Sequence, residues 1–581
     1  MTDGPLSIVA ATAQMTAPGQ IFEMETALIR GQELRVWKHT PETLRAVLDL
    51  SLNHAAKDFL VYEDERVTFE EHYRLASTMA ARLVALGLNV GDRVAIAMRN
   101  LPEWVVAFWS AITAGGVAVP LNAWWTGEEL AYGLADSGSK VLFCDTERLA
   151  RLEGHLAALE FLTDVIVVAE DRGRPSLRTA ATGQRVHAFS DVLGEVADDA
   201  VPPSVRIDPD DDATIFYTSG TTGRPKGAVG THRNASTNLM NLFFIGQRAQ
   251  LRFTDPSTPP SSTQNSFLLS VPLFHATGCL ASMVVNTAAG GKLVMMHHFE
   301  PERALELIER EQITTFGGVP TMVMQILDSP SLATRDTSSV RGISYGGAPA
   351  PPDLVRRIKA AFPSGQPGNG YGLTETSAAT SMNTGPDYVE RPDSVGTAVP
   401  VTDVAVVAED FDGPEPDPGR PVGPDVVGEL WVRGPQVVRG YWNRPEETAL
   451  IFTNGWLHTG DVARVDDEGF IYIVDRSKDM IIRGGENVYS VEVEAALFEH
   501  PDVSDCAVIG VPHPTLGEEV GAVIVPRTGH AIDEDELRHH VATRLAHFNV
   551  PTKIWFRDTG LPRNPAGKVL KRQLRDELLE A

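Results

Sequence analysis

Cysteine is scarce in this chain of 581 residues: only Cys144, Cys279 and Cys506 occur, and they lie far apart in the sequence. An odd number of widely separated cysteines offers neither the pairs of a disulfide framework nor the ligand spacing of a zinc site. The sequence therefore predicts a protein of a reducing compartment, and we expect it in the cytoplasm.

Positive charge is also in short supply. Against 77 aspartate and glutamate residues there are 50 lysine and arginine residues, which gives a formal net charge of -27 at pH 7. Because nucleic-acid backbones are held by clustered lysine and arginine side chains, this balance argues against a nucleic acid as partner. A smaller anion such as a nucleotide would have to be held by locally basic loops.

Long uncharged hydrophobic runs are limited to one, at residues 105–125. The glycine pair at 115–116 and Pro120 interrupt this run, so we expect a buried helix followed by a buried strand and no integral membrane span. The first residues lack a basic region followed by an apolar stretch, so no signal peptide is expected either.

What the chain does contain is a segment at residues 217–227, YTSGTTGRPKG, that cannot build a core. Glycines let backbone N–H groups turn toward a ligand, hydroxyls donate hydrogen bonds and lysine neutralises negative charge, which together suit a polyphosphate. The segment is not a Walker loop, because Pro225 precedes Lys226 and Gly227 follows it. An ordinary surface turn can have the same composition, so its meaning depends on other segments. The candidate polyphosphate ligands are Thr218, Ser219, Gly220, Thr221, Thr222, Gly223 and Lys226.

Two later segments suit the other parts of a nucleotide. Residues 369–376 read NGYGLTET, and Tyr371 between two glycines offers a flat face on which a purine can stack. Residues 455–461 read GWLHTGD, and the carboxylate of Asp461 can accept hydrogen bonds from both hydroxyls of a ribose. Taken alone, the first segment could be a glycine-rich turn with a solvated Glu375, and the second an exposed turn aspartate.

Together with residues 475–487 and 561–569, these segments resemble the motifs of the adenylate-forming superfamily, which comprises acyl-CoA synthetases, nonribosomal-peptide adenylation domains and beetle luciferases. The resemblance extends over most of the chain. It implies an enzyme that joins a carboxylic acid to ATP, giving an acyl-adenylate and pyrophosphate, and then transfers the acyl group to the thiol of coenzyme A. ATP, Mg²⁺ and coenzyme A are the implied cofactor and co-substrates.

Matched residue by residue, the resemblance implies roles around the adenine and the phosphates. Tyr371 would stack on the adenine and Thr374 would hydrogen-bond the α-phosphate. Glu375, with Thr221 of the polyphosphate segment, would hold the Mg²⁺ that bridges phosphate oxygens. The segment at residues 344–349 resembles the strip of the family that lies along the adenine, here through Gly347 and Ala348.

Further roles follow from the resemblance at the ribose and in the last hundred residues. Asp461 and Arg476 would bind the ribose hydroxyls. Lys568 would reach into the site and touch both the acyl carboxylate and the α-phosphate. Lys478 would be the pivot about which a small C-terminal domain rotates, which would bring the turn at 484–485 to the site for coenzyme A.

The acyl end of the site is predicted from the same resemblance, with His275 helping to gate the acyl and coenzyme A entrances. Many of the implied lining residues are small and none is charged, which favours a fatty or other large hydrophobic acid over acetate or an amino acid. An aryl acid is an alternative, and so is the interpretation that the glycines only serve backbone turns. The implied lining residues are Val271, Ala276, Thr277, the turn of Phe316, Gly317, Gly318, Val319 and Pro320, and Gly347 and Gly370.

The expected fold is α/β. Strand-like and helical segments alternate from residue 61 to 119, which predicts a layer with a largely parallel sheet. We expect a large N-terminal domain at 1–474, made of two α/β layers and a small β-barrel-like subdomain, then a hinge at 475–478. A small α+β C-terminal domain at 479–581 would carry the predicted catalytic lysine. In the motif of the hinge region, Ser490 stands where a proline is common in the family.

Two local expectations complete the fold. Thr40 followed by Pro41 predicts the capped start of a helix, and residues 247–265, rich in proline, serine, threonine and glutamine, predict an exposed excursion.

Other functions share these residues. An enzyme that passes its adenylate to a carrier protein or an amine would use the same ATP ligands. A luciferase-like oxygenase would need a luciferin pocket, and a nucleotide sensor without catalysis would share the fold. A homo-oligomer is also open.

Overall fold

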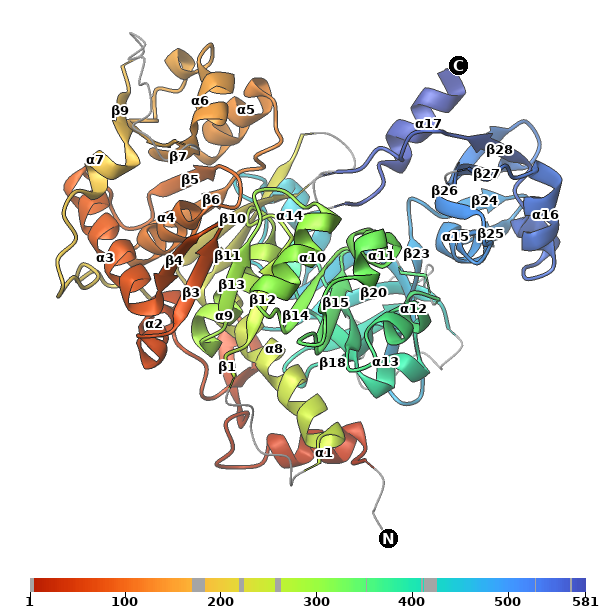
Figure 1. The fold of residues 1–581 in the computed structure, drawn as a ribbon, viewed down its shortest axis with the longest axis horizontal. Helices are drawn as coiled ribbons and strands as arrows, with labels where there is room; N and C mark the ends of the chain where they lie inside the picture. Colours follow the sequence, from red (N-terminus) through yellow and green to blue (C-terminus); the bar gives the residue numbers. More distant parts are fainter. Residues whose placement is uncertain are drawn as a thin grey trace.

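A computed structural model gives the fold of this chain (Figure 1). The structure describes residues 5–169, 183–218, 224–255, 263–348, 350–351, 353–408, 411, 426–527, 529–564 and 567–580. Five of the seven predicted polyphosphate ligands, residues 219–223, lie outside these ranges.

The first α/β layer is built on a sheet of seven strands in the order β11-β10-β6-β5-β7-β8-β9. All neighbours in it run parallel except β10 and β11, which are antiparallel and enclose the predicted polyphosphate loop. The strands are β5 (Arg93–Ala97), β6 (Val117–Pro120), β7 (Val141–Asp145), β8 (Asp164–Val168), β9 (Arg185–Ala188), β10 (Asp212–Thr218) and β11 (Lys226–Thr231). The helices of this region are α2 (Leu44–Leu50), α3 (Phe69–Ala85), α4 (Pro102–Thr113), α5 (Gly127–Ser137), α6 (Thr146–Leu152) and α7 (Phe189–Leu193).

The uncharged run at 105–125 forms the buried helix α4 and the buried strand β6, as the sequence predicts. Within the part of the chain that the structure describes, no helix combines the length and the apolar character that a membrane crossing requires.

The second layer is built on a larger sheet in the order β19-β20-β22-β23-β18-β17-β16-β15-β14-β12-β13-β3-β4, with β21 paired to β22. The small β-barrel-like subdomain expected from the sequence is continuous with this sheet, through the pairing of β18 with β23. Its strands are β3 (Asp58–Tyr62), β4 (Glu65–Thr68), β12 (Ser266–Leu269), β13 (Lys292–Met295), β14 (Thr315–Gly318), β15 (Gly342–Gly346), β16 (Gln366–Tyr371), β17 (Ser381–Thr384), β18 (Gly396–Ala398), β19 (Asp403–Val407), β20 (Gly428–Arg433), β21 (Phe452–Thr453), β22 (Trp456–Val465) and β23 (Phe470–Arg476). Its helices are α8 (His232–Phe253), α9 (Val284–Ala289), α10 (Pro301–Arg310), α11 (Pro320–Asp328), α12 (Asp353–Ala361), α13 (Pro386–Glu390) and α14 (Pro445–Ile451).

A small α+β unit follows and lies to one side of the larger domain in Figure 1. Its strands pair in the order β25-β24-β27-β26, with β28 beside β27, and its helices cover a separate apolar core. From α15 to α16 the order is helix, strand, strand, helix, in agreement with the small α+β unit expected from the sequence. The elements are β24 (Ile481–Arg483), β25 (Glu486–Val488), α15 (Ser490–Phe498), β26 (Val503–His513), β27 (Gly517–Pro526), α16 (Glu534–Ala542), β28 (Lys553–Phe556) and α17 (Lys571–Glu580).

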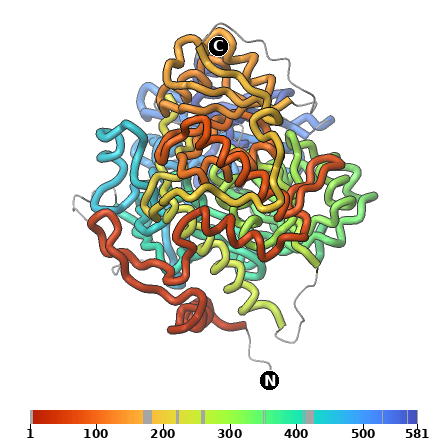
Figure 2. The backbone as a smooth tube through the Cα atoms, turned by 90° about the vertical axis from the view of Figure 1, so that its left-hand side faces the viewer, coloured from red at the N-terminus to blue at the C-terminus, as the bar shows by residue number. Residues whose placement is uncertain are grey.

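The N-terminal segment packs against α8 through helix α1 (Ile8–Met15) and the hairpin of β1 (Met24–Ile29) with β2 (Gln32–Trp37), at the lower end of the molecule in Figure 2. Trp37 is buried, and its Nε1 donates a hydrogen bond to Oδ1 of Asn241 at 2.8 Å. This segment is therefore anchored to the larger domain.

Two local predictions were wrong. Helix α2 begins at Leu44 and is capped by Thr43, whose hydroxyl accepts from the N–H of Ala46, so Thr40 is not the cap. The expected excursion at 247–265 begins later, because α8 continues to Phe253.

Candidate active site

The predicted ligands of the ribose and the adenine lie together on three strands. Asp461 in β22 faces Arg476 in β23 in the strand register, and Nε of Arg476 lies 2.9 Å from Oδ1 of Asp461. Tyr371, at the end of β16, donates its hydroxyl to Oδ2 of the same carboxylate at 2.7 Å. Because Asp461 is only 2% exposed, these contacts hold one buried carboxylate in a fixed orientation.

The hydroxyl of Tyr371 stays protonated in this arrangement. Burial raises the pKa of Tyr371 well above its ordinary value, and the charge of Asp461 raises the pKa further. The phenol is therefore a permanent hydrogen-bond donor that fixes the plane of its ring. The sequence predicts the ring as a stacking face but gives no sign of this hydroxyl contact.

A second group surrounds Glu375, which lies in the short 3₁₀ helix η5 (Thr374–Thr376). Oε1 of Glu375 accepts a hydrogen bond from the hydroxyl of Tyr441 at 2.6 Å. Nζ of Lys226 lies 5.5 Å from the centre of the Tyr441 ring. Tyr441 therefore contacts both the predicted Mg²⁺ ligand, through its hydroxyl, and Lys226 at the end of the predicted polyphosphate loop, through its ring.

Only the two ends of the polyphosphate loop can be described. Thr218 faces Lys226 in the register of β10 and β11, and the Thr218 hydroxyl lies 3.4 Å from the carbonyl oxygen of Lys226. The other predicted loop residues lie outside the described ranges; they are Ser219, Gly220, Thr221, Thr222 and Gly223.

Lys568 comes to the nucleotide site from the C-terminal domain. Its loop is closed by two hydrogen bonds, from the N–H of Lys568 to Oδ1 of Asn564 at 2.9 Å and from the N–H of Asn564 back to the carbonyl of Lys568 at 2.8 Å. The loop touches the larger domain, because a Cβ added to Gly567 would lie 2.5 Å from Cγ2 of Val319. Gly567 also has a φ of +80°, which favours glycine.

The charge environment of Lys568 shows which side chains it approaches. Burial lowers the pKa of Lys568 to about 8, and the positive charges of Arg476 and Lys478 lower it as well. Asp479 and Asp461 act in the opposite direction. The ammonium group therefore lies within electrostatic reach of the ribose ligands, which brings the predicted catalytic lysine to the predicted nucleotide site.

His275 lies beside the predicted acyl end of the site. Burial lowers the pKa of His275 to about 4, so its ring is neutral at pH 7. Its Nε2 is buried and has no hydrogen-bond partner among the described residues, while the ring packs on Phe274 at 4.8 Å between centroids. A buried ring nitrogen without a partner is available to a ligand.

The glycines of the predicted acyl pocket differ in how much free space surrounds the position of a Cβ atom. A Cβ on Gly317 would lie 1.6 Å from the carbonyl oxygen of Ser344, so this glycine serves the close pairing of β14 with β15 and adds no free volume. Gly347 and Gly370 face open space, with no atom within 3.8 Å of an added Cβ at either. The prediction that small lining residues leave volume for the acid was wrong for Gly317, and for Gly347 and Gly370 it stays a prediction.

The remaining predicted acyl residues are less uniform. Gly318 has a φ of +149° and lies against the Met322 sulfur. Val271 and Ala276 are buried, whereas Thr277 is exposed. Ala348 lies beside Gly347 and is partly buried.

The turn predicted for coenzyme A lies on the surface of the C-terminal domain. Gly484 and Gly485 have φ of +63° and +93° in the turn between β24 and β25, and both are exposed. No described contact joins them to the nucleotide ligands. Lys478, the predicted pivot, is exposed on the segment between β23 and β24.

The residues present fit a magnesium nucleotide. Among the residues described, no group of three or more histidine, cysteine, aspartate or glutamate side chains could hold a metal ion. Mg²⁺ with a nucleotide commonly takes one or two carboxylates and completes its shell with phosphate oxygens and water, so a single Glu375 fits. Lys226 and Lys568 are the predicted sources of positive charge for the phosphates, in a chain that is acidic overall.

Two contacts in this site escaped the sequence analysis. Tyr441 supports Glu375 from 66 positions further along the chain, and Asp479 acts on Lys568. A lone tyrosine after a strand carries no periodic signal, so only the resemblance could have singled it out.

Comparison with known proteins agrees with this geometry. A family model of AMP-binding enzymes matches residues 50–442, and a model of the AMP-binding enzyme C-terminal domain matches residues 492–568. A feruloyl-CoA synthase of Amycolatopsis sp is 38% identical over 512 residues, which cover 88% of this chain and 93% of the relative. A long-chain-fatty-acid–CoA ligase of Bacillus subtilis is 33% identical over 562 residues, which cover 93% of this chain and 95% of the relative.

A solved structure extends the comparison to the fold. ATP-bound MatB from Rhodopseudomonas palustris has a TM-score of 0.78 and 32% identity, over 92% of this chain and 98% of its own. The chain belongs to the AMP-binding enzyme family. The resemblance seen in the sequence and the expected α/β architecture, with a large N-terminal and a small C-terminal domain, are thereby confirmed.

Proposed function

We propose that this chain is an AMP-forming carboxylate–CoA ligase that activates a hydrophobic carboxylic acid with ATP and transfers the acyl group to coenzyme A. The observation that carries the proposal is the seating of the Lys568 loop against the larger domain, where a Cβ on Gly567 would lie 2.5 Å from Cγ2 of Val319. The charges of Asp461 and Arg476 act on the pKa of Lys568, in keeping with this placement.

In the first half-reaction, a carboxylate oxygen of the acid attacks the α-phosphorus of ATP, and the bond from that phosphorus to the β-phosphate oxygen breaks. Both reactants are anions, so the residues mainly neutralise charge and align the groups. Lys568 would hold the acyl carboxylate against the α-phosphate, and Thr374 would donate to the same phosphate. Lys226 would hold the leaving pyrophosphate in line.

The nucleoside end would be fixed by residues that are already oriented. Asp461 would accept hydrogen bonds from the ribose hydroxyls, and Tyr371 would present its ring to the adenine. Tyr441 would hold Glu375 in the orientation that Mg²⁺ requires. When bound, Mg²⁺ would supply positive charge that offsets the negative charge of the phosphates.

In the second half-reaction, the coenzyme A thiol attacks the acyl carbon, the bond to the AMP oxygen breaks and the thiol proton is lost to solvent. We propose a hinge at 475–478 between domains at 1–474 and 479–581. Rotation about Lys478 would withdraw Lys568 and bring the turn of Gly484 and Gly485 to the site. Neutral His275 would line the entrance of the acyl group and of coenzyme A.

A large apolar acid is the substrate class that we propose. Gly347 and Gly370 leave open space, and the side chains proposed for the acyl end carry no charge that would bind a second carboxylate or an amino group. The relatives include both an aryl-acid and a fatty-acid ligase, so both classes belong in the test. We propose a cytoplasmic location, since the three buried thiols suit a reducing compartment.

The test is an AMP-release assay with ATP, Mg²⁺ and a set of acids: acetate, benzoates, cinnamates, fatty acids and sterol-type acids, each with and without coenzyme A. We expect turnover with a large hydrophobic acid and coenzyme A. Pyrophosphate release that never leads to an acyl-CoA product would favour transfer to an amine or a carrier protein. ATP binding without pyrophosphate release for any acid would favour a nucleotide sensor and overturn the proposal.

A further inference from the structure

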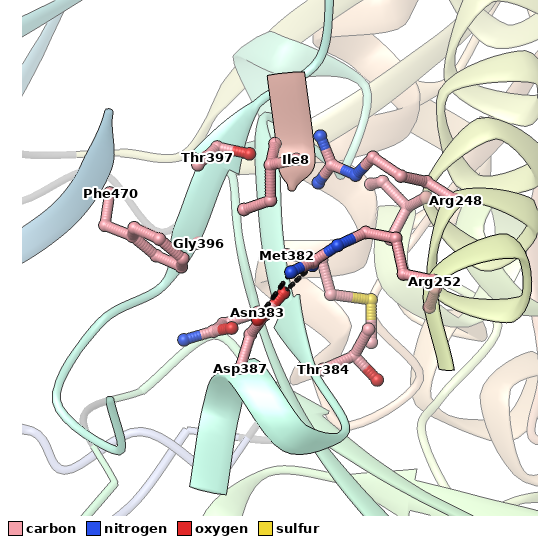
Figure 3. A pocket seen from close by; sticks show the side chains of 12 residues that line it. Ile8, Arg248, Arg252, Met382, Asn383, Thr384, Asp387, Gly396, Thr397 and Phe470 are labelled. Carbon is pink, nitrogen blue, oxygen red and sulfur yellow. Dashed lines mark hydrogen bonds and ion pairs between the residues drawn. The ribbon is translucent and has the colours of Figure 1, made fainter. Parts of the chain in front are cut away.

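A small cavity lies on the far side of β17 from the strand that carries Gly370. Helix α8, the N-terminal helix α1 and the strands β17 and β18 close around it (Figure 3). Its volume of about 10 Å³ leaves room for one small molecule or ion and excludes a nucleotide or a fatty acid. The cavity is lined by Ile8, Ile245, Arg248, Ala249, Arg252, Met382, Asn383, Thr384, Asp387, Gly396, Thr397 and Phe470.

Arg248 brings to this cavity a charge that no ion pair with a described residue compensates. The residue is 7% exposed, and its guanidinium makes no hydrogen bond and no ion pair with any described residue. The guanidinium carbon lies over the ring of Phe244, 5.3 Å from the ring centre, in a cation–π contact. In Figure 3 the guanidinium points toward Ile8 and Thr397, into the cavity. Buried arginines are almost always paired, so this one is unusual.

The second arginine in the wall does not share this property. Arg252, one turn further along α8, donates to Oδ1 of Asp387 at 3.1 Å and from its Nε to the carbonyl of Leu6 at 2.7 Å. The wall therefore carries two guanidinium groups and one carboxylate, and the carboxylate is already engaged. One positive charge remains in excess.

A hydroxyl in the wall is also without a partner. Oγ1 of Thr397, in β18, is buried and makes no hydrogen bond with the described residues. A guanidinium can only donate, and a hydroxyl can donate as well as accept. Two unsatisfied donors thus face the same small space from α8 and from β18.

We propose that this cavity binds a small monovalent anion, of which chloride is the physiological example. An anion accepts hydrogen bonds from both Arg248 and Thr397 and cancels the excess charge. A water molecule could satisfy the hydroxyl, but it would leave a buried charge without compensation. Burial lowers the pKa of Arg248 to about 10, and the charge of Arg252 lowers it further, while Asp387 acts in the opposite direction. The guanidinium is therefore still charged at neutral pH.

The anion would connect three parts of the chain that are distant in sequence. Ile8 closes the cavity from the N-terminal segment, and Met382 closes it from β17, where it pairs in register with Gly370 of β16. We therefore expect the bound anion to stabilise the docking of α1 and the strand that supports the proposed acyl pocket. This inference does not depend on which acid the enzyme activates.

The first test measures thermal unfolding of the full chain in sodium chloride, sodium bromide and sodium gluconate at equal ionic strength. Both halides should raise the Tm by about 2 °C or more over gluconate, because a ligand that binds only the folded state stabilises it. In Arg248→Met, which keeps the packing and removes the charge, the halide effect should be lost. Arg233→Met is the matched control on the same helix, since Arg233 pairs with Asp210 at 2.7 Å, and it should keep the halide effect.

The second test locates the ion. Crystals soaked in sodium bromide should show an anomalous peak between Arg248 and Thr397. If Arg248→Met does not fold, Thr397→Val replaces it in the thermal unfolding test, and the halide effect on Tm should be weaker in that variant. Equal Tm values in halide and gluconate, or a bromide soak without a peak at this position, would overturn the proposal in favour of a water-filled cavity.

Discussion

Ser490 holds the carboxylate of Asp475 with two hydrogen bonds. The backbone N–H of Ser490 donates to Oδ2 at 2.5 Å, and the hydroxyl donates to Oδ1 at 3.0 Å. Both residues are fully buried or nearly so. Lys571 of α17 donates to the Ser490 hydroxyl at 2.7 Å and pairs with Glu494 at the same distance, so the contact belongs to a buried polar network of the C-terminal domain.

The proposed pivot lies between the two residues of this contact in the sequence. Asp475 lies in β23, ahead of the proposed pivot Lys478, and Ser490 begins α15 after it. The hydrogen bonds are therefore made in the orientation that brings Lys568 to the ribose ligands. We expect them to favour the adenylate-forming state over the thioester-forming state.

Loss of the Lys568 side chain should slow the adenylation step. We expect Lys568→Ala to lower the rate of adenylation by about two to three orders of magnitude, the range for loss of a preorganised donor. ATP-pyrophosphate exchange with a substrate acid measures this step. Lys553→Ala, at an exposed lysine of the same domain, is the control and should retain its activity. Exchange at the wild-type rate in Lys568→Ala would refute the role of Lys568.

The pH dependence of the same step follows from the pKa of Lys568. Because burial lowers this pKa to about 8, the side chain is protonated below pH 8 and loses its charge as the pH rises through that value. We expect kcat/KM for adenylation to fall above about pH 8, since this ratio reports the ionisation of the free enzyme. In Lys568→Arg the side chain stays charged, so the decrease of kcat/KM should begin at a higher pH. The adenylation rate of this variant should be lower than that of the wild type at every pH. An unchanged profile in that variant would assign the fall to another group.

The elements that the sequence predicted well are those with a local signal. The uncharged run broken by a glycine pair and Pro120 gave both α4 and β6, because periodicity and turn residues act over a few positions. The cap of α2 was misplaced by three residues. Thr40 and Thr43 are both suitable cap residues, and only the backbone geometry decides that Thr43 reaches the N–H of Ala46.

The contacts that the sequence could not predict are long-range. Tyr441 meets Glu375 because the chain after β20 returns to β11, where Ala228 and Tyr441 form a bridge. Gly317 is small because β15 brings the Ser344 carbonyl against it, and not because a ligand needs the space. Such distances are set by which strands become neighbours, and that depends on the whole sheet.

A rigid pivot should slow one half-reaction selectively. Lys478→Pro fixes φ and removes an N–H at the proposed pivot, so we expect it to slow thioester formation far more than adenylation. Single-turnover transfer from a preformed adenylate to coenzyme A, compared with pyrophosphate exchange, measures the difference. Lys478→Ala controls for the loss of the side chain and should leave both steps nearly unchanged. Equal slowing of both steps by proline would contradict the hinge.

Ser490→Pro should change the two half-reactions in the reverse sense to Lys478→Pro, because it should slow adenylation and not thioester formation. Ser490 is the first residue of α15, where proline fits the helix, and Tyr489 before it is already extended with ψ of 114°, so the backbone can accept the change. Proline has no N–H and no hydroxyl, and both hydrogen bonds to Asp475 would be lost. A hydrogen bond to a charged group contributes about 1.5–3 kcal/mol, or roughly a tenfold to hundredfold shift between the two orientations.

We therefore expect Ser490→Pro to slow adenylation, while transfer from a preformed adenylate to coenzyme A is maintained or faster. Ser490→Ala keeps the N–H donor to Asp475 and loses only the hydroxyl, so it should fall between the wild type and the proline variant. A fall in Tm of both variants without any change in the ratio of the two rates would show that the network stabilises the fold and has no part in selecting the orientation. A changed ratio would establish that Ser490, where the family commonly has proline, holds Lys568 in the adenylate-forming position.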